Sequence, residues 1–286
     1  MRRRSWLLAL ALAALVSAWA APPLYAAANL ITSCTKTVQI TSPGAYLIGN
    51  DLRASSAGFG ICIMILAPDV VLDLNGHTIR GPGGFSEGIT IALAATNARV
   101  VNGSITGFGT GLVDGGSRAL LSGLDVSGSK GAGIEVVSIP NHVLSDTVVA
   151  RNHVHDNDVG ILLLDVLRVQ VLANTVTDNG GDGIALVLTS AQNQVAGNTV
   201  QGNRRHGIFV GAGTSLPLHE RGNRIEGNTV SGSQEAIDLA PGAVQTTVVG
   251  NAASGDSSVD LADDNPGCDA NRWVGNRGSV SQPCIH

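Results

Sequence analysis

Carboxylates, histidines and arginines gather in three short polar segments between residues 155 and 206, and acid–base chemistry uses these side chains. The segments read HDNDV (155–159), TDNGGD (177–182) and QGNRRH (201–206). Two carboxyl groups can serve as general acid and general base on a glycosidic bond. Alternatively, an arginine can neutralise a uronate while a base removes its C5 proton. The candidate catalytic residues are Asp178, Asp182, His206, Arg205, His155 and Asp156.

A structural interpretation of the same segments competes with the catalytic one. Asp, Asn and Gly are the residues that bends favour, because they tolerate left-handed backbone and hydrogen-bond to the nearby main chain. Opposite charges on neighbouring segments would also relieve repulsion between like charges. We favour this interpretation, since turn chemistry alone accounts for the composition.

Two histidines flank Val154 in the segment HVH (153–155), so both should point to one face of a strand. The repeat described below places Asp125 beside His153. Asp125, His153 and His155 are therefore weak candidates for a metal site, because zinc usually takes three or four protein ligands. The alternative is an exposed polar strand face.

Two segments could hold calcium. GGDGIALV (180–187) partly matches a calcium-binding G-G-x-G-x-D repeat, but Ala185 stands where the ligand carboxylate should be. In DLADDNPGCD (260–269), the side chains of Asp263, Asp264 and Asp269 could bind Ca²⁺. An acidic loop closed by a disulfide is the favoured interpretation. The sequence predicts no firm cofactor, and calcium is the one that it leaves open.

One aromatic side chain is well placed to stack on a sugar ring. Phe209 lies between Ile208 and Val210, which should face the interior, so Phe209 should point outward beside His206. It is the candidate ligand-stacking residue. Aromatic residues make up only 3% of the chain, and a single stacking platform makes tight sugar binding less favoured.

The elements that must position these residues are short strands in a repeat. A Gly-Ile pair or a close variant recurs every 22 to 29 residues, a period typical of a solenoid. Apolar residues alternate, as in Ile184 and Leu186, and no run carries a helical apolar stripe, so each repeat should hold strands. The pairs are Gly60-Ile61, Gly88-Ile89, Gly111-Leu112, Gly133-Ile134, Gly160-Ile161, Gly183-Ile184, Gly207-Ile208 and Ala236-Ile237.

Stacking such coils at a strand spacing of roughly 4.8 Å aligns equivalent residues. Asp182 and His206 both directly precede a Gly-Ile pair, so they should be vertical neighbours. Asn suits a stacked bend because it tolerates left-handed backbone and can bond to its copies above and below. The predicted columns are Val154, Val176, Val200 and Val230; Ile161, Ile184, Ile208 and Ile237; and the asparagines Asn152, Asn174, Asn198, Asn228 and Asn251.

The N-terminus has the pattern of a secretory signal. Three arginines precede an apolar run, and a stretch of small residues follows that ends at Ala28. Removing residues 1–28 leaves 14 Lys and Arg against 22 Asp and Glu, a net charge near −8. We expect a secreted, periplasmic or cell-surface protein with no transmembrane segment after signal removal. An acidic chain without a basic run is a poor candidate for nucleic acid.

Four cysteines remain in the mature chain, an even number that suggests two disulfides in an exported protein. Three pairings are possible, and grouping by position favours Cys34–Cys62 and Cys268–Cys284. In a competing interpretation, the sequence Ile31-Thr32-Ser33-Cys34 acts as a lipobox and Cys34 is acylated.

The repeats, together with APDVVLDLNGHTIRG (67–81) and DNPGCDANRW (264–273), resemble the pectin-lyase-like superfamily and its exported bacterial β-helix proteins. The resemblance covers about residues 30–286. It implies an all-β fold, a right-handed single-stranded parallel β-helix (β-solenoid) of about eight coils with capped ends. We expect a signal peptide at 1–28, an N-terminal cap at 29–59, the β-helix at 60–262 and a C-terminal disulfide cap at 263–286.

The resemblance carries over no catalytic residue. NTV and RHGI depart from the N-T-D and G-H-G elements of polygalacturonases, and the D-P-H-D signature of mannuronan epimerases is absent. The favoured prediction is a monomeric, non-catalytic solenoid that binds a polysaccharide or another cell-surface component, or serves a structural role. The alternative is a polysaccharide lyase, epimerase or glycoside hydrolase that uses the Asp, His and Arg side chains of residues 155–206.

Overall fold

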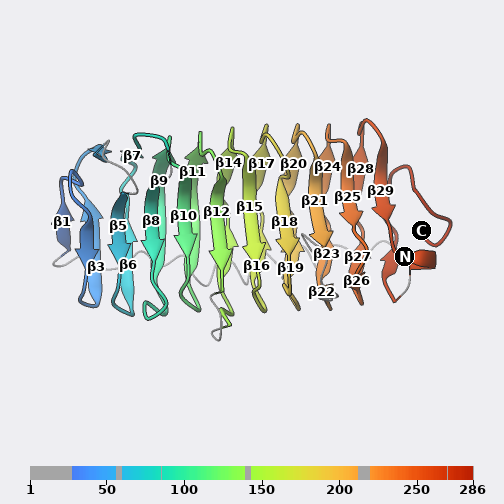
Figure 1. Ribbon diagram of the computed structural model, residues 1–286, viewed down its shortest axis with the longest axis horizontal. Helices are drawn as coiled ribbons and strands as arrows, with labels where there is room; N and C mark the ends of the chain where they lie inside the picture. The colour runs from blue at the N-terminus through green and yellow to red at the C-terminus, as the bar shows by residue number, and fades with distance from the viewer. Residues whose placement is uncertain are drawn as a thin grey trace, which may run out of the picture.

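The computed structural model describes residues 28–55, 60–84, 86–138, 143–211, 220–268 and 270–285. The chain winds into coils that stack along one axis, with the N-terminal coils at one end and the C-terminal coils at the other (Figure 1). One sheet has ten parallel strands, and successive coils each add one strand to it, so the solenoid has about nine turns, close to the predicted eight. Apart from Ala28, the predicted signal peptide lies outside the described residues.

The 10-stranded sheet forms one long side of the solenoid (Figure 1). It carries the predicted Gly-Ile pairs in register from Gly88-Ile89 onward. The first predicted pair, Gly60-Ile61, is wrong by two residues, because Ile63 lies opposite Ile89. The strands of this sheet are β2 (Val38–Ile40), β5 (Ile61–Ile65), β8 (Glu87–Ile91), β10 (Thr110–Asp114), β12 (Ala132–Val137), β15 (Val159–Leu164), β18 (Ile184–Val187), β21 (His206–Gly211), β25 (Glu235–Leu239) and β29 (Val259–Asp263).

The 18-stranded sheet forms the rest of the coil as two rows of strands, which the long strands β9 and β11 join. The first row is β1 (Asn29–Ile31), β3 (Gly44–Ile48), β6 (Val70–Asp73), β9 (Arg99–Thr106), β11 (Leu120–Ser127), β13 (Val148–Ala150), β16 (Gln170–Leu172), β19 (Gln194–Ala196), β23 (Arg224–Glu226), β27 (Thr247–Val249) and β30 (Arg272–Val274). The second row adds β4 (Leu52–Arg53), β7 (Thr78–Arg80), β14 (His153–His155), β17 (Thr175–Thr177), β20 (Thr199–Gln201), β24 (Thr229–Ser231) and β28 (Ala252–Ser254).

The minor elements are a two-stranded sheet of β22 (Glu220–Arg221) and β26 (Ala243–Val244), and a short 3₁₀ helix, η1 (Pro266–Cys268). In the part of the chain that the structure describes, no helix has the length and apolar composition that a membrane crossing requires.

Alternation along each strand puts one set of apolar residues inside the coil. Ile184 lies opposite Ile161 on the preceding coil and opposite Ile208 on the next, and all three are fully buried. Val176 has the same relation to Val154 and Val200. The predicted columns of Val and Ile are therefore confirmed, because a period of two in the strand fixes which side chains face inward.

Buried asparagines close the bends in ladders. The backbone N–H and the side-chain amide of Asn174 both donate to Oδ1 of Asn198, at 2.8 and 3.0 Å. Equivalent bonds join the predicted ladder from Asn152 through Asn251, and it continues to Asn276. A second ladder, of Asn157, Asn179 and Asn203, was not predicted. Each ladder satisfies buried main-chain groups that would otherwise lose their partners.

Disulfides hold both ends of the solenoid. Cys34 bonds to Cys62 and Cys268 bonds to Cys284, as predicted. The sulfur of Cys34 is therefore in a disulfide, and the lipobox interpretation is wrong for this structure. The boundaries of the caps at 29–59 and 263–286 stay a prediction.

Candidate functional site

Asp182 and His206 lie on consecutive coils, directly before the pairs Gly183-Ile184 and Gly207-Ile208, whose isoleucines are in register. Oδ1 of Asp182 lies 2.7 Å from Nδ1 of His206 and also accepts the backbone N–H of His206, at 3.2 Å. The predicted vertical neighbours are thus in direct contact. The carboxylate holds the imidazole by a short hydrogen bond and leaves Nε2 on the opposite side of the ring.

Two further carboxylates face that opposite side. Nε2 of His206 lies 3.6 Å from Oε2 of Glu235 and 3.6 Å from Oδ2 of Asp238. Both come from β25, where Glu235 is in register with His206, and Asp238 with Phe209. Sequence reasoning missed both residues, although continuing the column past His206 to the Ala236-Ile237 pair would have found Glu235. We call Asp182, His206, Glu235 and Asp238 the His206 cluster.

The His206 cluster is only slightly open to solvent. The side chain of His206 is 11% exposed, that of Asp238 is 6% exposed, and that of Glu235 is 22% exposed. The ring of Phe209 stacks on the imidazole with centroids 4.8 Å apart, which is a close parallel contact. Phe209 alternates with the buried Ile208 and Val210, so its outward direction follows from the strand, as predicted.

Burial and charge shift the pKa of two members. Burial lowers the pKa of His206, but the hydrogen bond and charge of Asp182 outweigh it, and the pKa is raised. Burial raises the pKa of Asp238 to about 7, against the opposing effect of His206. Nearby carboxylates, Asp264 and Glu235 among them, add to the increase in the pKa of Asp238.

The remaining catalytic candidates surround this cluster or lie apart from it. A guanidinium nitrogen of Arg205 is 3.7 Å from Oδ2 of Asp182, and the Arg205 side chain is 61% exposed. Asp178 is exposed in the bend that follows β17, where its φ is 55° and its side chain lies against Gly202 of the next coil. The structure thus brings Asp182, His206 and Arg205 together and leaves Asp178 in a turn.

The other candidates form a second cluster on β11 and β14. Asp125 is in register with His153, and its carboxylate reaches Nδ1 of His153 at 3.2 Å and Nε2 of His155 at 3.5 Å. Nδ1 of His155 also contacts Asp156, at 2.7 Å. The two imidazole rings stack with centroids 4.3 Å apart. Asp125, His153 and His155 could together hold a metal ion, but Asp125 and His153 are nearly half exposed.

In the acidic loop near the C-terminus, the carboxylate of Asp263 accepts hydrogen bonds from the protein itself. Asp263 is fully buried and accepts hydrogen bonds from the Asn265 backbone, the Asn271 amide and the Trp273 indole. These donors hold the last coil together. Asp269, another of the residues that could bind Ca²⁺, lies outside the described residues.

A shallow groove of about 700 Å³ crosses the first row of the 18-stranded sheet. One residue per coil borders it at the turn before each strand, and all five have φ between 52° and 64°. These border residues are Asp69, Asn97, Arg118, Asp146 and Arg168. The other lining residues are Val71, Arg99, Ala119, Leu120, Val148 and Gln170. We call it the arginine groove.

Hydrogen bonds fix the border of the arginine groove. Asn97 donates to Asp69 at 2.9 Å, and Nε of Arg118 donates to Asn97 at 2.8 Å. Arg168 donates twice to the carboxylate of Asp146, at 2.8 and 3.1 Å, which lowers the pKa of Asp146. Sequence reasoning missed this groove, because its residues are single side chains in otherwise unremarkable turns.

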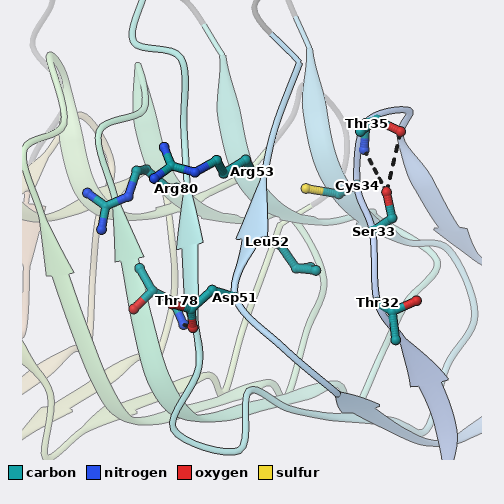
Figure 2. A pocket seen from close by; sticks show the side chains of 9 residues that line it. All are labelled: Thr32, Ser33, Cys34, Thr35, Asp51, Leu52, Arg53, Thr78 and Arg80. Atoms are coloured by element: carbon teal, nitrogen blue, oxygen red, sulfur yellow. Dashed lines mark hydrogen bonds between the residues drawn. The ribbon is translucent and has the colours of Figure 1, made fainter.

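A smaller pocket of about 290 Å³ lies at the N-terminal end. Figure 2 shows the side chains of Arg53 and Arg80, which are in register on β4 and β7, above Asp51 and Thr78. Asp51 accepts the backbone N–H of Thr78 at 3.0 Å, and Cys34 of the first disulfide lines the same pocket. Seven of the pocket's nine lining residues belong to the predicted N-terminal cap at 29–59, and Thr78 and Arg80 come from the next coil.

The stacked parallel coils, the asparagine ladders and the outward-facing clusters define a parallel β-helix protein. The chain belongs to the right-handed β-helix family, because the family model "Right handed beta helix region" matches residues 87–253, more than half of the chain. A search of the curated proteins gave no match.

Several solved structures share the fold. The Dettilon tailspike protein (gp208) aligns with a TM-score of 0.65 at 16% identity, over 88% of this chain and 60% of its own length. An alginate lyase from Paenibacillus sp. str. FPU-7 aligns with a TM-score of 0.59 at 12% identity, over 87% of this chain and 100% of that one. The A-module of the Azotobacter vinelandii mannuronan C-5 epimerase AlgE6 gives 0.52 at 14% identity, over 96% and 94%. At these identities the likeness is one of fold alone.

Proposed function

We propose that this protein is exported and binds a linear acidic polysaccharide along the arginine groove. The proposal rests on the length and the lining of this groove. The groove spans the strands β6, β9, β11, β13 and β16, roughly 20 Å at the usual strand spacing. That length suits several consecutive sugars of a linear chain. Two disulfides in a small protein support an oxidising compartment outside the cytoplasm.

The lining chemistry favours an acidic sugar. Arg99, Arg118 and Arg168 outnumber the two carboxylates of Asp69 and Asp146 in an otherwise acidic chain. Guanidinium groups bind carboxylates with two parallel hydrogen bonds, and the existing bonds of Arg118 and Arg168 hold these side chains in place beforehand. The apolar floor around Leu120 and Val148 can lie against the faces of sugar rings. Structural neighbours named for alginate and mannuronan add support from fold analogy.

Binding to alginate, polygalacturonate and a neutral glycan tests the proposal, with titration calorimetry as the measurement. The double variant Arg118→Gln/Arg168→Gln should bind the acidic polymers at least about tenfold more weakly, since each charge-assisted hydrogen bond is worth about 1.5–3 kcal/mol. Arg224→Gln is the matched control, because Arg224 is 46% exposed, against 50% for Arg168, and lies in the same row of strands but outside the groove. Unchanged affinity in the double variant, or an equal loss in the control, would contradict the groove as the binding site.

A second candidate function is cleavage or epimerisation of the polysaccharide at the His206 cluster. The convergence of Asp182, His206, Glu235 and Asp238 from three coils favours it. Arg205, mostly exposed beside Asp182, could receive a uronate carboxylate, and Glu235 is the most exposed carboxylate of the cluster. The stacked Phe209 adds an apolar surface beside them.

Purified protein should then produce unsaturated ends, new reducing ends or a changed uronate ratio on one of the acidic polymers. Asp182→Asn and His206→Ala should each reduce that turnover by a factor of 100 or more, in the range that loss of an acid–base residue costs. Asp178→Asn is the control, because Asp178 lies in a turn outside the cluster. Turnover that survives both cluster variants would rule this site out.

A further inference from the structure

We propose that His206, Glu235 and Asp238 hold a divalent transition-metal ion, with zinc as the preferred ion. The ligands are Nε2 of the imidazole and one oxygen from each of the two carboxylates. All three atoms lie within 4.8 Å of one another. The inference names a cofactor for the second candidate function, but it does not depend on polysaccharide binding in the arginine groove.

The two distances from the imidazole to the carboxylates fit a metal better than they fit hydrogen bonds. Nε2 of His206 is 3.6 Å from an oxygen of Glu235 and 3.6 Å from an oxygen of Asp238. Both distances exceed the usual range for an N–H···O bond. Zinc ligands lie about 2.0–2.2 Å from the ion, so two ligands at neighbouring corners of a tetrahedron are roughly 3.4 Å apart. The two distances from Nε2 are close to that value, and the two carboxylate oxygens lie within 4.8 Å of each other.

Asp182 prepares the imidazole for this role. Its Oδ1 is 2.7 Å from Nδ1 of His206 and accepts a hydrogen bond from the N–H at that position. The lone pair of the neutral ring then lies on Nε2, which faces Glu235 and Asp238. Metal-binding histidines commonly donate their other N–H to a carboxylate in this way, which fixes the tautomer and the ring orientation.

Asp238 has a buried carboxylate oxygen that lacks a hydrogen-bond donor. This residue is only 4% exposed, and its Oδ1 is buried with no hydrogen-bond partner. Its other oxygen points toward the imidazole. A buried carboxylate oxygen without a donor is costly, and a cation in the cluster would compensate for it.

The ligand set determines which ions fit. An imidazole nitrogen with two carboxylates suits zinc and similar transition metals, whereas calcium takes six to eight oxygen ligands. Three protein ligands leave a fourth position of a tetrahedral ion for water or for an oxygen of a bound molecule. The cluster lies on the outward face of the 10-stranded sheet, where such a molecule can approach.

The second cluster, Asp125, His153 and His155, provides the matched control. It too has three groups that could hold a metal ion. It is far more exposed, however, because Asp125 and His153 are nearly half exposed. Nδ1 of His153 also already contacts the carboxylate of Asp125, its would-be fellow ligand, at 3.2 Å. His153→Ala therefore removes a candidate ligand of comparable chemistry without touching the His206 cluster.

Titration calorimetry of chelator-stripped protein with ZnCl₂, and visible spectroscopy with CoCl₂, test the proposal without any polysaccharide. We expect one ion per chain and a tetrahedral cobalt spectrum. His206→Ala and Asp238→Asn should bind zinc at least 100-fold more weakly, and Asp182→Asn should bind it 10- to 100-fold more weakly. His153→Ala should bind zinc as the unchanged protein does. Asp238→Asn is nearly isosteric, so it keeps the test valid if His206→Ala does not fold.

Absence of stoichiometric zinc binding in the unchanged protein would overturn the proposal. So would full binding by His206→Ala and Asp238→Asn, or a loss of binding in His153→Ala alone. Polysaccharide binding and turnover are measured separately, with and without chelator. Their absence would contradict the proposed function but not the proposed zinc site.

Discussion

Asp114 is a carboxylate inside the coil, in the column that Ile91 and Val136 occupy on the neighbouring coils. It is fully buried, and its carboxylate accepts the backbone N–H of Gly116 at 3.0 Å and the hydroxyl of Thr147 at 2.8 Å. Burial raises the pKa of Asp114 to about 7, against the effect of these two donors. At the residue scale, a single ionisable group thus makes the core sensitive to pH.

The sign of this effect follows from proton binding. The pKa of Asp114 is about 7 in the folded chain and ordinarily 3.8. Between about pH 4 and pH 7, Asp114 is therefore protonated in the folded state and ionised in the unfolded state. The stability that Asp114 contributes is therefore present below pH 4 and is lost as the pH rises toward 7 and above. Asp114→Asn should flatten the pH dependence of the free energy of unfolding between pH 5 and 8, by at most about 3 kcal/mol.

Denaturant unfolding measured across pH 5 to 8 checks this prediction. Thr147→Val should move the loss of stability to higher pH, since it removes a hydroxyl that lowers the pKa of Asp114. An Asp114→Asn profile that parallels the unchanged protein would show that another group governs this pH range.

At the scale of the strand, the Gly-Ile pairs set how closely successive coils approach. A Cβ built on Gly160 would lie 2.4 Å from the carbonyl oxygen of Gly183 and 2.5 Å from a methyl of Val176. Real Cβ atoms do not approach that closely, so glycine is needed here for close backbone contact and not for an unusual φ. Ala236 occupies the same position near the C-terminal end, which shows that one coil allows more room.

Gly160→Ala should therefore destabilise the chain by about 1–3 kcal/mol, the usual cost of overpacking a filled core. Gly180→Ala is the matched control, because its nearest neighbour would be 3.6 Å away, an ordinary contact. Thermal melts of both variants give the comparison. Equal melting temperatures for the two would argue against close coil packing at this glycine.

The whole molecule is a one-dimensional stack, in which each coil contacts its neighbours and the two ends have one neighbour only. Stability in such stacks is a sum of local terms, so the ends need extra support. Cys34–Cys62 and Cys268–Cys284 supply it at opposite ends.

Replacing Cys268 and Cys284 by alanine should thus act locally. We expect amide hydrogen exchange to increase in β29 and β30 while β12 and β15 keep their protection, with a total cost of about 2–4 kcal/mol. The Cys34→Ala/Cys62→Ala variant is the reciprocal control and should affect β2 and β5 instead. Exchange that increases uniformly along the solenoid in either variant would contradict this picture of local stability.

The sequence by itself determined the fold, the inward columns and the contact between Asp182 and His206. Each of these depends on a repeat of short strands, where the period of two and the Gly-Ile register set which residues meet on adjacent coils. Of the three possible disulfide pairings, the sequence favoured the one observed, because the cysteines fall into one pair at each end.

Only the tertiary structure decided which polar residues share an environment. Glu235 and Asp238 join His206 from a coil that repeats the anchor as Ala-Ile, and Asp178 stays in a turn although it is close to Asp182 in sequence. Nor does the local pattern distinguish the buried Asp114 from an exposed bend aspartate. The partners of Asp114 and His206 come from other coils, 33 and 32 residues away in sequence, so composition within one coil could not specify them.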